Sequence, residues 1–285
     1  MSSIAIVTDT DSSLPLDVAD KYGIRQVPIM IHFGDEIFRS ELDITDTEVF
    51  ARVDREGELP TTSAPSPGQF ATAYEEALSH GADSIVCICV SSAVSGTYNA
   101  ALNACSLMPD CDITVVDSQR MSMAQGFMAI AAAEAAEAGA TVPEIVEVVE
   151  SMRERIHLYA ALSTLKYLAM SGRIGHIAAG MGTLLNIKPI LTLNDKGGLD
   201  LLERVRTRKK AWNRVMELTV NAVGDSPIER LAILHVDALE DAKKFKRELE
   251  AVLPCPEDVI IAGLTAGLSV HSGAGIVGAT VVTAE

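Results

Sequence analysis

Two hydroxyl side chains and a glycine, Ser95-Gly96-Thr97, follow a short apolar segment at residues 84–90. The segment is uncharged and rich in β-branched residues, which is typical of a strand buried on both faces. A helix is expected over residues 98–107, so free backbone N–H groups at its start would face a ligand beyond the strand's carboxyl end. This geometry favours an anion. A serine at such a turn also commonly caps the helix, and the sequence leaves both roles open for Ser95.

A second pair of hydroxyls, Thr62 and Ser63, lies in residues 60–68, a stretch that contains three prolines. The prolines fix an extended loop, and Ser66 with the proline after it begins the helix expected over residues 69–79. Ser66 is assigned to the helix cap. Thr62 and Ser63 have no such local role, so they are candidate hydrogen-bond donors to a ligand.

Three further features carry charge or hydrogen-bonding capacity. Arg173 lies in a glycine-flanked turn that exposes it, and His271 lies among glycines, where it could equally be a structural turn residue. A polar cluster at residues 8–13 follows the strand expected over residues 4–7. Open α/β sheets place their ligands at this edge, but a helix cap with solvated acids explains the same cluster.

Composition excludes several classes of protein. The chain has 285 residues, of which 48% are hydrophobic and 4% aromatic, and a net charge of −16. The acidic balance and the scarcity of aromatic rings argue against nucleic acids and anionic membrane surfaces as partners. Five cysteines without a C-x-x-C pair predict reduced, mostly buried thiols and no metal site. Neither a signal peptide nor an integral membrane segment is expected, which favours a cytoplasmic protein.

The apolar segments predict an α/β fold with two domains. Up to about residue 155, short buried strands alternate with helices, which is typical of a largely parallel sheet. The later part is α+β in character, with a hairpin at residues 187–205 around a glycine-rich turn. We therefore predict a parallel-sheet βα domain at residues 1–164, an α+β domain at residues 165–285, and a cleft between them. Residues 259–284, uncharged and glycine-punctuated, are expected to form strands and turns.

Eight short motifs follow one another along nearly the whole chain. They are Ile6-Val-Thr-Asp9 with Leu14-Pro15, Thr62-Ser-Ala-Pro-Ser66, Ser91-Ser-Ala-Val-Ser-Gly-Thr-Tyr98, Val116-Asp-Ser118, Ser171-Gly-Arg-Ile174, Asn186-Ile-Lys-Pro-Ile190, Val205-Arg-Thr-Arg-Lys-Lys210 and His271-Ser-Gly-Ala-Gly275. In this order they resemble the DegV family of bacterial fatty-acid-binding proteins. The resemblance implies a non-enzymatic protein that buries one long-chain fatty acid and presents its carboxylate to a fatty acid kinase, which makes the acyl phosphate. Asp11 departs from the family pattern, which has a hydroxyl residue there.

The resemblance also implies which side chains hold the ligand. Thr62 and Ser95 would donate hydrogen bonds to the carboxylate, with no catalytic residue, metal or cofactor. The full set of implied ligand-binding residues is Thr62, Ser63, Ser92, Ser95, Arg173 and His271. About 15 methylenes at roughly 0.8 kcal/mol each offer on the order of 10 kcal/mol before association costs, provided that an apolar tunnel encloses them. The residues expected to line this tunnel, which core packing explains equally well, are Leu184, Leu185, Ile187 and Ile190.

A basic run is the exception in this acidic chain, and it comprises Arg204, Arg206, Arg208, Lys209 and Lys210. Such a run is usually a solvated face. Its isolation favours docking to an acidic partner, which by the resemblance would be the kinase.

Another class of function fits some of the same residues. Ser95 as nucleophile and His271 as base would make a serine hydrolase or acyltransferase, with Asp9 or Asp117 as the acid. The chain has these residue types, but no G-x-S-x-G motif surrounds Ser95.

Overall fold

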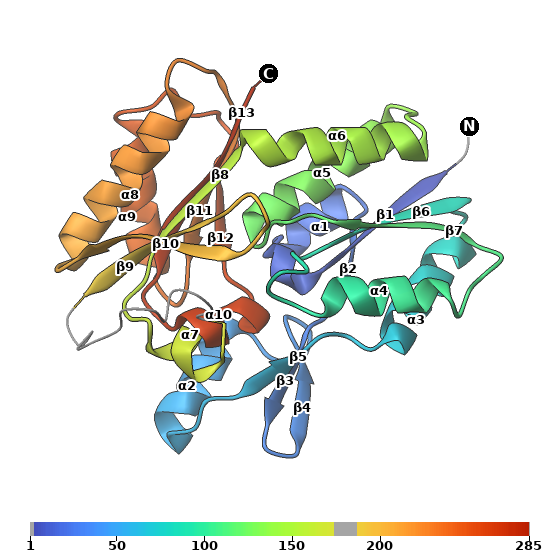
Figure 1. The fold of residues 1–285 in the computed structure, drawn as a ribbon, viewed down its shortest axis with the longest axis horizontal. Helices are drawn as coiled ribbons and strands as arrows, with labels where there is room; N and C mark the ends of the chain where they lie inside the picture. The colour runs from blue at the N-terminus through green and yellow to red at the C-terminus, as the bar shows by residue number, and fades with distance from the viewer. Residues whose placement is uncertain (1–2, 174–186, 285) are drawn as a thin grey trace.

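The computed structural model describes residues 3–173 and 187–284 (Figure 1). Within these ranges the strands form three sheets. The first is parallel, with the order β2 (Arg25–Val27), β1 (Ile4–Asp9), β6 (Ser84–Cys89) and β7 (Asp112–Asp117). The second is mixed, with the order β10 (Leu199–Val205), β9 (Lys188–Leu193), β8 (Ile156–Ala161), β13 (Val277–Thr283), β11 (Ile228–His235) and β12 (Ile260–Gly263). The third is antiparallel, with the order β4 (Glu36–Arg39), β3 (Met30–Phe33) and β5 (Thr61–Ser63).

The parallel sheet is covered by helices on both faces. α5 (Met123–Glu137) and α6 (Val142–Arg155) contact one face, and α3 (Pro67–Ser79) and α4 (Thr97–Cys105) contact the other. Alternation along β6 explains this arrangement, because Val86 belongs to the core cluster on the α5 face and Cys87 to the cluster under α3 and α4. The predicted α/β class, with a parallel sheet in the first half and a β6 strand buried on both faces, is confirmed.

The six-stranded sheet shares a core with the parallel sheet. α8 (Arg208–Val223) and α9 (Leu239–Glu250) cover its outer face, and α5 and α6 lie between the two sheets (Figure 1). One continuous cluster therefore joins Ile6 of the first sheet to Leu158 and Leu234 of the second. β8 pairs within the six-stranded sheet, so the change of sheet occurs at Ile156. The division of domains at residues 164 and 165 stays a prediction.

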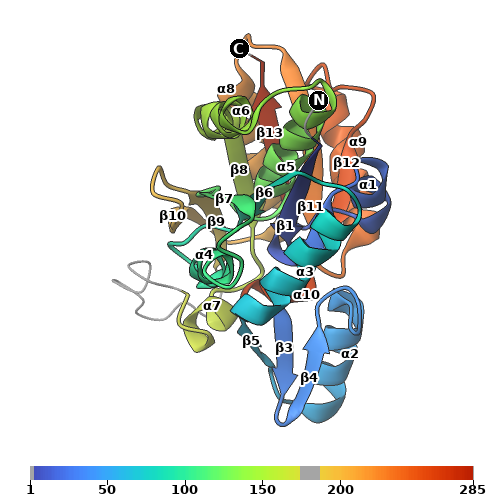
Figure 2. The ribbon, with the colours of Figure 1, turned by 90° about the vertical axis from the view of Figure 1, so that its right-hand side faces the viewer.

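The three-stranded sheet projects from the rest of the molecule together with α2 (Asp46–Glu56) (Figure 2). α10 (Ala266–Ser272), from the other end of the chain, packs against it through Ala266 and Val270. The remaining helical segments are η1 (Thr10–Ser12), α1 (Leu16–Lys21) and α7 (Lys166–Met170). No helix in the described ranges has both the length and the apolar character needed to cross a bilayer.

Two local predictions were wrong. Residues 266–272 form a helix instead of strands and turns, and residues 61–63 form a strand instead of a loop. The helix contains weak helix formers, but its first N–H groups have tertiary partners: Ala266 N–H donates to Glu41 Oε1 at 3.1 Å and Gly267 N–H to Ser40 Oγ at 3.4 Å. Tertiary contacts thus overrode local propensity.

Candidate ligand-binding site

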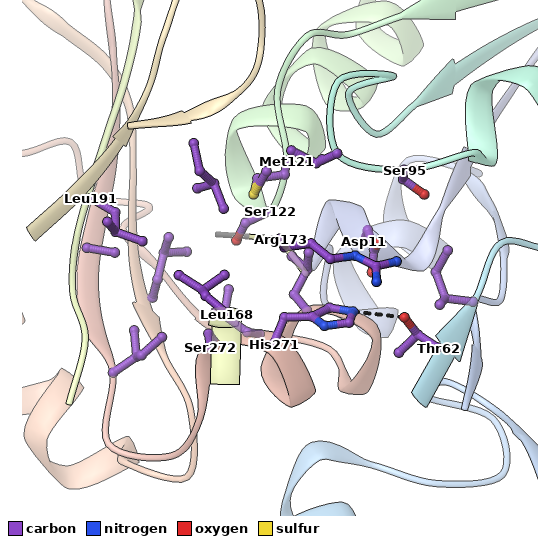
Figure 3. A pocket seen from close by; sticks show the side chains of 18 of the residues that line it. Asp11, Thr62, Ser95, Met121, Ser122, Leu168, Arg173, Leu191, His271 and Ser272 are labelled. Atoms are coloured by element: carbon purple, nitrogen blue, oxygen red, sulfur yellow. Dashed lines mark hydrogen bonds between the residues drawn. The ribbon is translucent and has the colours of Figure 1, made fainter. Parts of the chain in front are cut away.

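A cavity lies where the two large sheets meet α10 and β5. It contains about 1000 Å³ of space free of protein atoms, part of it open to solvent. One end is apolar and is lined by Leu158, Leu162, Leu168, Leu191, Leu199, Leu234, Leu264, Leu268 and Ile276. The other end is polar and is lined by Asp11, Thr62, Ser95, Arg173 and His271 (Figure 3). Ser63, next to Thr62, lines the cavity as well. The cavity therefore suits an elongated apolar molecule with one polar end.

Small residues on the six-stranded sheet leave room for the apolar end. Ala160 of β8 lines the cavity together with Leu158 of the same strand and Leu162 just after it, and it pairs directly with Gly278 of β13. Because directly paired residues of antiparallel strands point to the same face, two small residues adjoin here. Gly278 admits no side chain, since a Cβ there would lie 2.7 Å from the carbonyl oxygen of Tyr159. The side chains on this part of the sheet are therefore short, which leaves space for the cavity.

Thr62 and His271 meet at the polar end although 209 positions separate them in the sequence. Thr62 pairs with Ile31 of β3, and its Oγ1 lies 2.8 Å from His271 Nε2 (Figure 3). The other ring nitrogen, Nδ1, is buried and has no hydrogen-bond partner in the described part of the chain. Burial, helped by the charge of Arg173, lowers the pKa of His271 to about 4. The ring is therefore neutral at pH 7.

Ser95 borders the cavity from the loop before α4. Its Oγ accepts the Thr97 N–H at 3.3 Å and lies 2.8 Å from Thr97 Oγ1. The helix-cap role considered from the sequence is not the one observed, because Gly96 is the N-cap of α4 and no side chain caps it. Ser95 instead makes a local bond to the Thr97 N–H and lies at the polar end of the cavity.

Arg173 lies at the polar end between Ser122 and Thr62 in Figure 3, and its Nη1 donates to the carbonyl oxygen of Ser171 at 2.7 Å. The residue also borders two neighbouring pockets, one beside Tyr167 and Met170 and one beside the loop before α4. Arg173 thus lies where the cavity approaches the surface.

The two remaining predicted ligand residues are placed differently from each other. Ser63 lines the cavity, and its Oγ lies 2.8 Å from His32 Nε2. Ser92 lines the neighbouring pocket beside the loop before α4 instead, where its N–H donates to Asp117 Oδ1 at 3.1 Å. The cavity thus brings together Thr62, Ser63, Ser95, Arg173 and His271, without Ser92.

The expected tunnel residues need correction. Ile190 packs on the opposite face of the sheet, in the cluster with Trp212, whereas the next residue, Leu191, lines the cavity. Neighbouring residues of a strand point to opposite faces of the sheet. The prediction therefore chose the wrong residue of this pair for the cavity lining. Ile187 is absent from the lining, and Leu184 and Leu185 lie outside the described residues. Sequence reasoning missed Ser122 as a lining residue, whereas Asp11 belongs to the polar cluster at residues 8–13, for which a ligand edge and a helix cap were both left open.

The arrangement does not make a nucleophile and base pair. The described hydrogen bonds of the Ser95 hydroxyl go to Thr97, and His271 Nε2 contacts Thr62 instead of Ser95. An acid that would orient the imidazole is also missing among the described residues, because Nδ1 has no partner there. The same part of the chain holds no cluster of three or more potential metal ligands.

Fold and cavity define a class of protein: an α/β protein with a largely apolar cavity beside its two large sheets, polar at one end. The family model described as "uncharacterised protein, DegV family" matches residues 3–284. Protein DegV of Bacillus subtilis is 34% identical over 253 residues, which cover 88% of this chain and 89% of that protein. The chain therefore belongs to the DegV family, as the ordered motifs predicted.

Solved structures of relatives have the same fold. A fatty-acid-binding DegV family protein from Thermus thermophilus has a TM-score of 0.91 and 33% identity, covering 99% of this chain and 100% of its own. DegV of Bacillus subtilis, a fatty-acid-binding protein, has a TM-score of 0.88 and 32% identity, with both chains covered completely. A stearic-acid-binding protein from Eubacterium ventriosum has a TM-score of 0.90 and 25% identity, covering 99% of this chain and 98% of its own.

Acidification is expected to destabilise the fold through His271. The pKa of about 4 in the folded state lies below the ordinary value of 6.5, so the unfolded chain binds the proton first. Stability present above pH 6.5 is lost as the pH falls towards 4, by about 3 kcal/mol. Urea unfolding at pH 7 and pH 4 should show a smaller loss for His271→Gln than for wild type.

A control variant separates this effect from other titrating groups. Buried acids with raised pKa values, such as Asp9, stabilise the fold as the pH falls, which opposes the effect of His271. The free energies of unfolding of the variants are therefore compared with that of wild type at each pH. His80→Gln, at an exposed position, should match wild type. Equal pH dependence in all three proteins would contradict the assignment to His271.

Proposed function

We propose that this protein binds a single long-chain fatty acid, with the acyl chain among the leucines and the carboxylate at the polar end. The observation that carries the proposal is one cavity whose apolar end continues into hydroxyls, a neutral histidine and an arginine. Fatty acid binding by the relatives from Thermus thermophilus and Bacillus subtilis supports it.

Thr62 and Ser95 are proposed to donate hydrogen bonds to the carboxylate. The neutral ring of His271 makes this possible for Thr62, because a proton on Nε2 can be donated to Thr62 Oγ1 across the 2.8 Å contact. The hydroxyl proton of Thr62 is then free to point at the ligand. Arg173 supplies the positive charge, and hydrogen bonds to an ionised acceptor are the stronger kind.

The acyl chain supplies most of the affinity. Roughly 0.8 kcal/mol for each buried methylene gives on the order of 10 kcal/mol for about 15 methylenes before association costs. Tight binding therefore needs no covalent step. We infer that the protein is a carrier without catalysis of its own.

The bound acid is proposed to be presented to a fatty acid kinase that docks on the basic run. Arg204, Arg206 and Lys209 are exposed in a chain of net charge −16. Arg208 and Lys209 begin α8, whose first turn holds no acid, and cations are unfavourable at a helix N-terminus. Helix stability therefore does not explain these residues, whereas an acidic partner does.

Mass spectrometry of an organic extract from the untreated purified protein tests fatty acid binding. One equivalent of a long-chain fatty acid is expected from wild type and none from Thr62→Ala/Ser95→Ala, because both carboxylate donors are removed. Thr61→Ala is the matched control, since Thr61 neighbours Thr62 in β5 but does not line the cavity.

Two results together would contradict the proposal. The extract of the wild-type protein would contain no fatty acid, and the protein would retain none after incubation with fatty acids of 14 to 20 carbons. An ester-hydrolysis assay on the same samples would then test the hydrolase alternative. Loss of the ligand in Thr61→Ala as well would show that the effect is not specific to the proposed donors.

A further inference from the structure

Asp11 is a buried carboxyl group at the polar end of the cavity. It lies in η1, directly after β1, with 6% of its surface exposed, and borders the cavity with Arg173 and His271 (Figure 3). Its Oδ1 is enclosed and has no hydrogen-bond partner among residues 3–173 and 187–284. Gly267 of α10 makes room for it, since a Cβ at that position would overlap Oδ1. The fold thus places an unpartnered acid where the proposed ligand carries a carboxylate.

Asp9, two residues earlier, is buried as well but is well supplied with donors. Its Oδ1 accepts the Asp11 N–H at 3.0 Å, and its Oδ2 accepts the Val90 N–H at 2.8 Å and the Gln125 side-chain amide at 3.1 Å. Hydrogen bonds to the charged form stabilise it, and two neighbouring buried carboxyls do not readily carry two charges. The negative charge of the pair therefore resides on Asp9 and the proton on Asp11.

The surroundings of Asp11 agree with this distribution. Burial, followed by the charge of Asp9, raises the pKa of Asp11 well above its usual range, against a smaller opposing effect of Arg173. Burial raises the pKa of Asp9 only to about 6, because its hydrogen bonds oppose the rise. At pH 7 the pair thus carries a single charge.

We propose that Asp11 acts as a neutral carboxylic acid that donates a hydrogen bond to the carboxylate of the bound fatty acid. This inference rests on the proposed function. An ionised Asp11 would repel the ligand carboxylate, whereas a protonated one forms an O–H···O⁻ bond of the strong, charge-assisted kind. Fatty acid binding therefore requires the proton on Asp11 and weakens when that proton is lost.

The other titratable groups around Asp11 do not produce this effect. Those facing it are Asp9, Arg173, His271 and, at the start of α10, Glu41, whose Oε1 accepts the Ala266 N–H. The first turn of α5, which also packs against η1, holds no acid or base. The pKa values of Asp9 and His271, about 6 and about 4, lie below neutrality. Burial raises the pKa of Glu41 as well, so Glu41→Gln is measured beside the Asp11 variants. A loss of affinity above pH 7 that persists in Glu41→Gln points to Asp11.

The test measures the dissociation constant of palmitate from pH 6.5 to 9.5 on delipidated protein. Wild-type affinity should be constant at the lower end and fall at least tenfold across the range, approaching tenfold per pH unit above the pKa of free Asp11. Asp11→Asn and Asp11→Ser keep a hydrogen-bond donor that does not titrate, so their affinity should not depend on pH. Two substitutions of different size guard against a folding defect in one of them.

Two outcomes overturn the inference. Wild-type affinity that stays constant to pH 9.5, together with equally tight binding by Asp11→Leu, which has no donor, shows that no proton is needed. An equal fall in Asp11→Asn assigns the proton to another group. A third outcome concerns the proposed function itself. If wild type and both variants are folded but none of them binds palmitate at any pH, the proposed function is refuted, and the role of Asp11 with it. Proton uptake on binding at pH 8.5, measured as the dependence of the binding enthalpy on buffer ionisation, should occur in wild type only.

Discussion

Ala160→Phe is expected to abolish tight binding of long-chain fatty acids while the fold is retained. The side chain of Ala160 lines the cavity between Leu158 and Leu162, opposite a glycine that adds no bulk. A phenyl ring there occupies space that three or four methylenes of the acyl chain would need. At roughly 0.8 kcal/mol per methylene the loss is about 3 kcal/mol, or roughly a hundredfold in the dissociation constant of palmitate. Equilibrium dialysis of radiolabelled palmitate measures it.

The neighbouring alanine provides the matched control. Ala161 points to the other face of β8, into the cluster with Ile190 and Trp212. Ala161→Phe should overpack that cluster, lowering the free energy of unfolding by about 1–3 kcal/mol, and should leave palmitate affinity unchanged. Ala160→Phe should unfold at the same or a higher temperature than wild type, because the ring fills empty space. Wild-type affinity in Ala160→Phe would show that the acyl chain does not lie in this cavity.

The succession of strands and helices followed from local pattern, because apolar period, caps and turn residues act over short distances. Thr45 and Ser66 each form a capping box with the residue three positions later in the chain. Such a pair can be recognised in the sequence. α10 was missed because its N–H groups are satisfied by Ser40 and Glu41, more than 220 positions away. A helix that depends on tertiary partners carries little local signal.

The site was predictable only in part. Ser95 follows from a strand and helix boundary, but nothing local joins Thr62 to His271, and family resemblance alone placed them together. Asp11 was recognised as a departure from the family pattern, yet its place on the cavity wall depends on η1 and on the glycine at position 267. Ile190 and Leu191 show a different limit: an apolar strand buried on both faces does not reveal which face meets a ligand.

Reversing three exposed charges of the basic run is expected to stop transfer of the bound acid to a fatty acid kinase. The change is Arg204→Glu/Arg206→Glu/Lys209→Glu, which replaces attraction for an acidic partner by repulsion. Arg208 is left unchanged because it forms an ion pair with Asp241 and lies over the ring of Trp212, 4.6 Å from its centroid. Electrostatic steering is worth about 10- to 1000-fold in association rate at low salt, so the rate of acyl phosphate formation should fall within that range.

The measurement is ATP-dependent formation of acyl phosphate from preloaded protein and the cognate kinase, at low and high salt. Palmitate affinity should match wild type, because none of the three residues lines the cavity. The control, Lys21→Glu/Arg55→Glu/Lys196→Glu, makes the same change in net charge at exposed positions outside the run. Equal slowing in both triple variants would attribute the effect to net charge and reject the docking surface. A selective loss in the first variant, smaller at high salt where charges are screened, is what local docking requires.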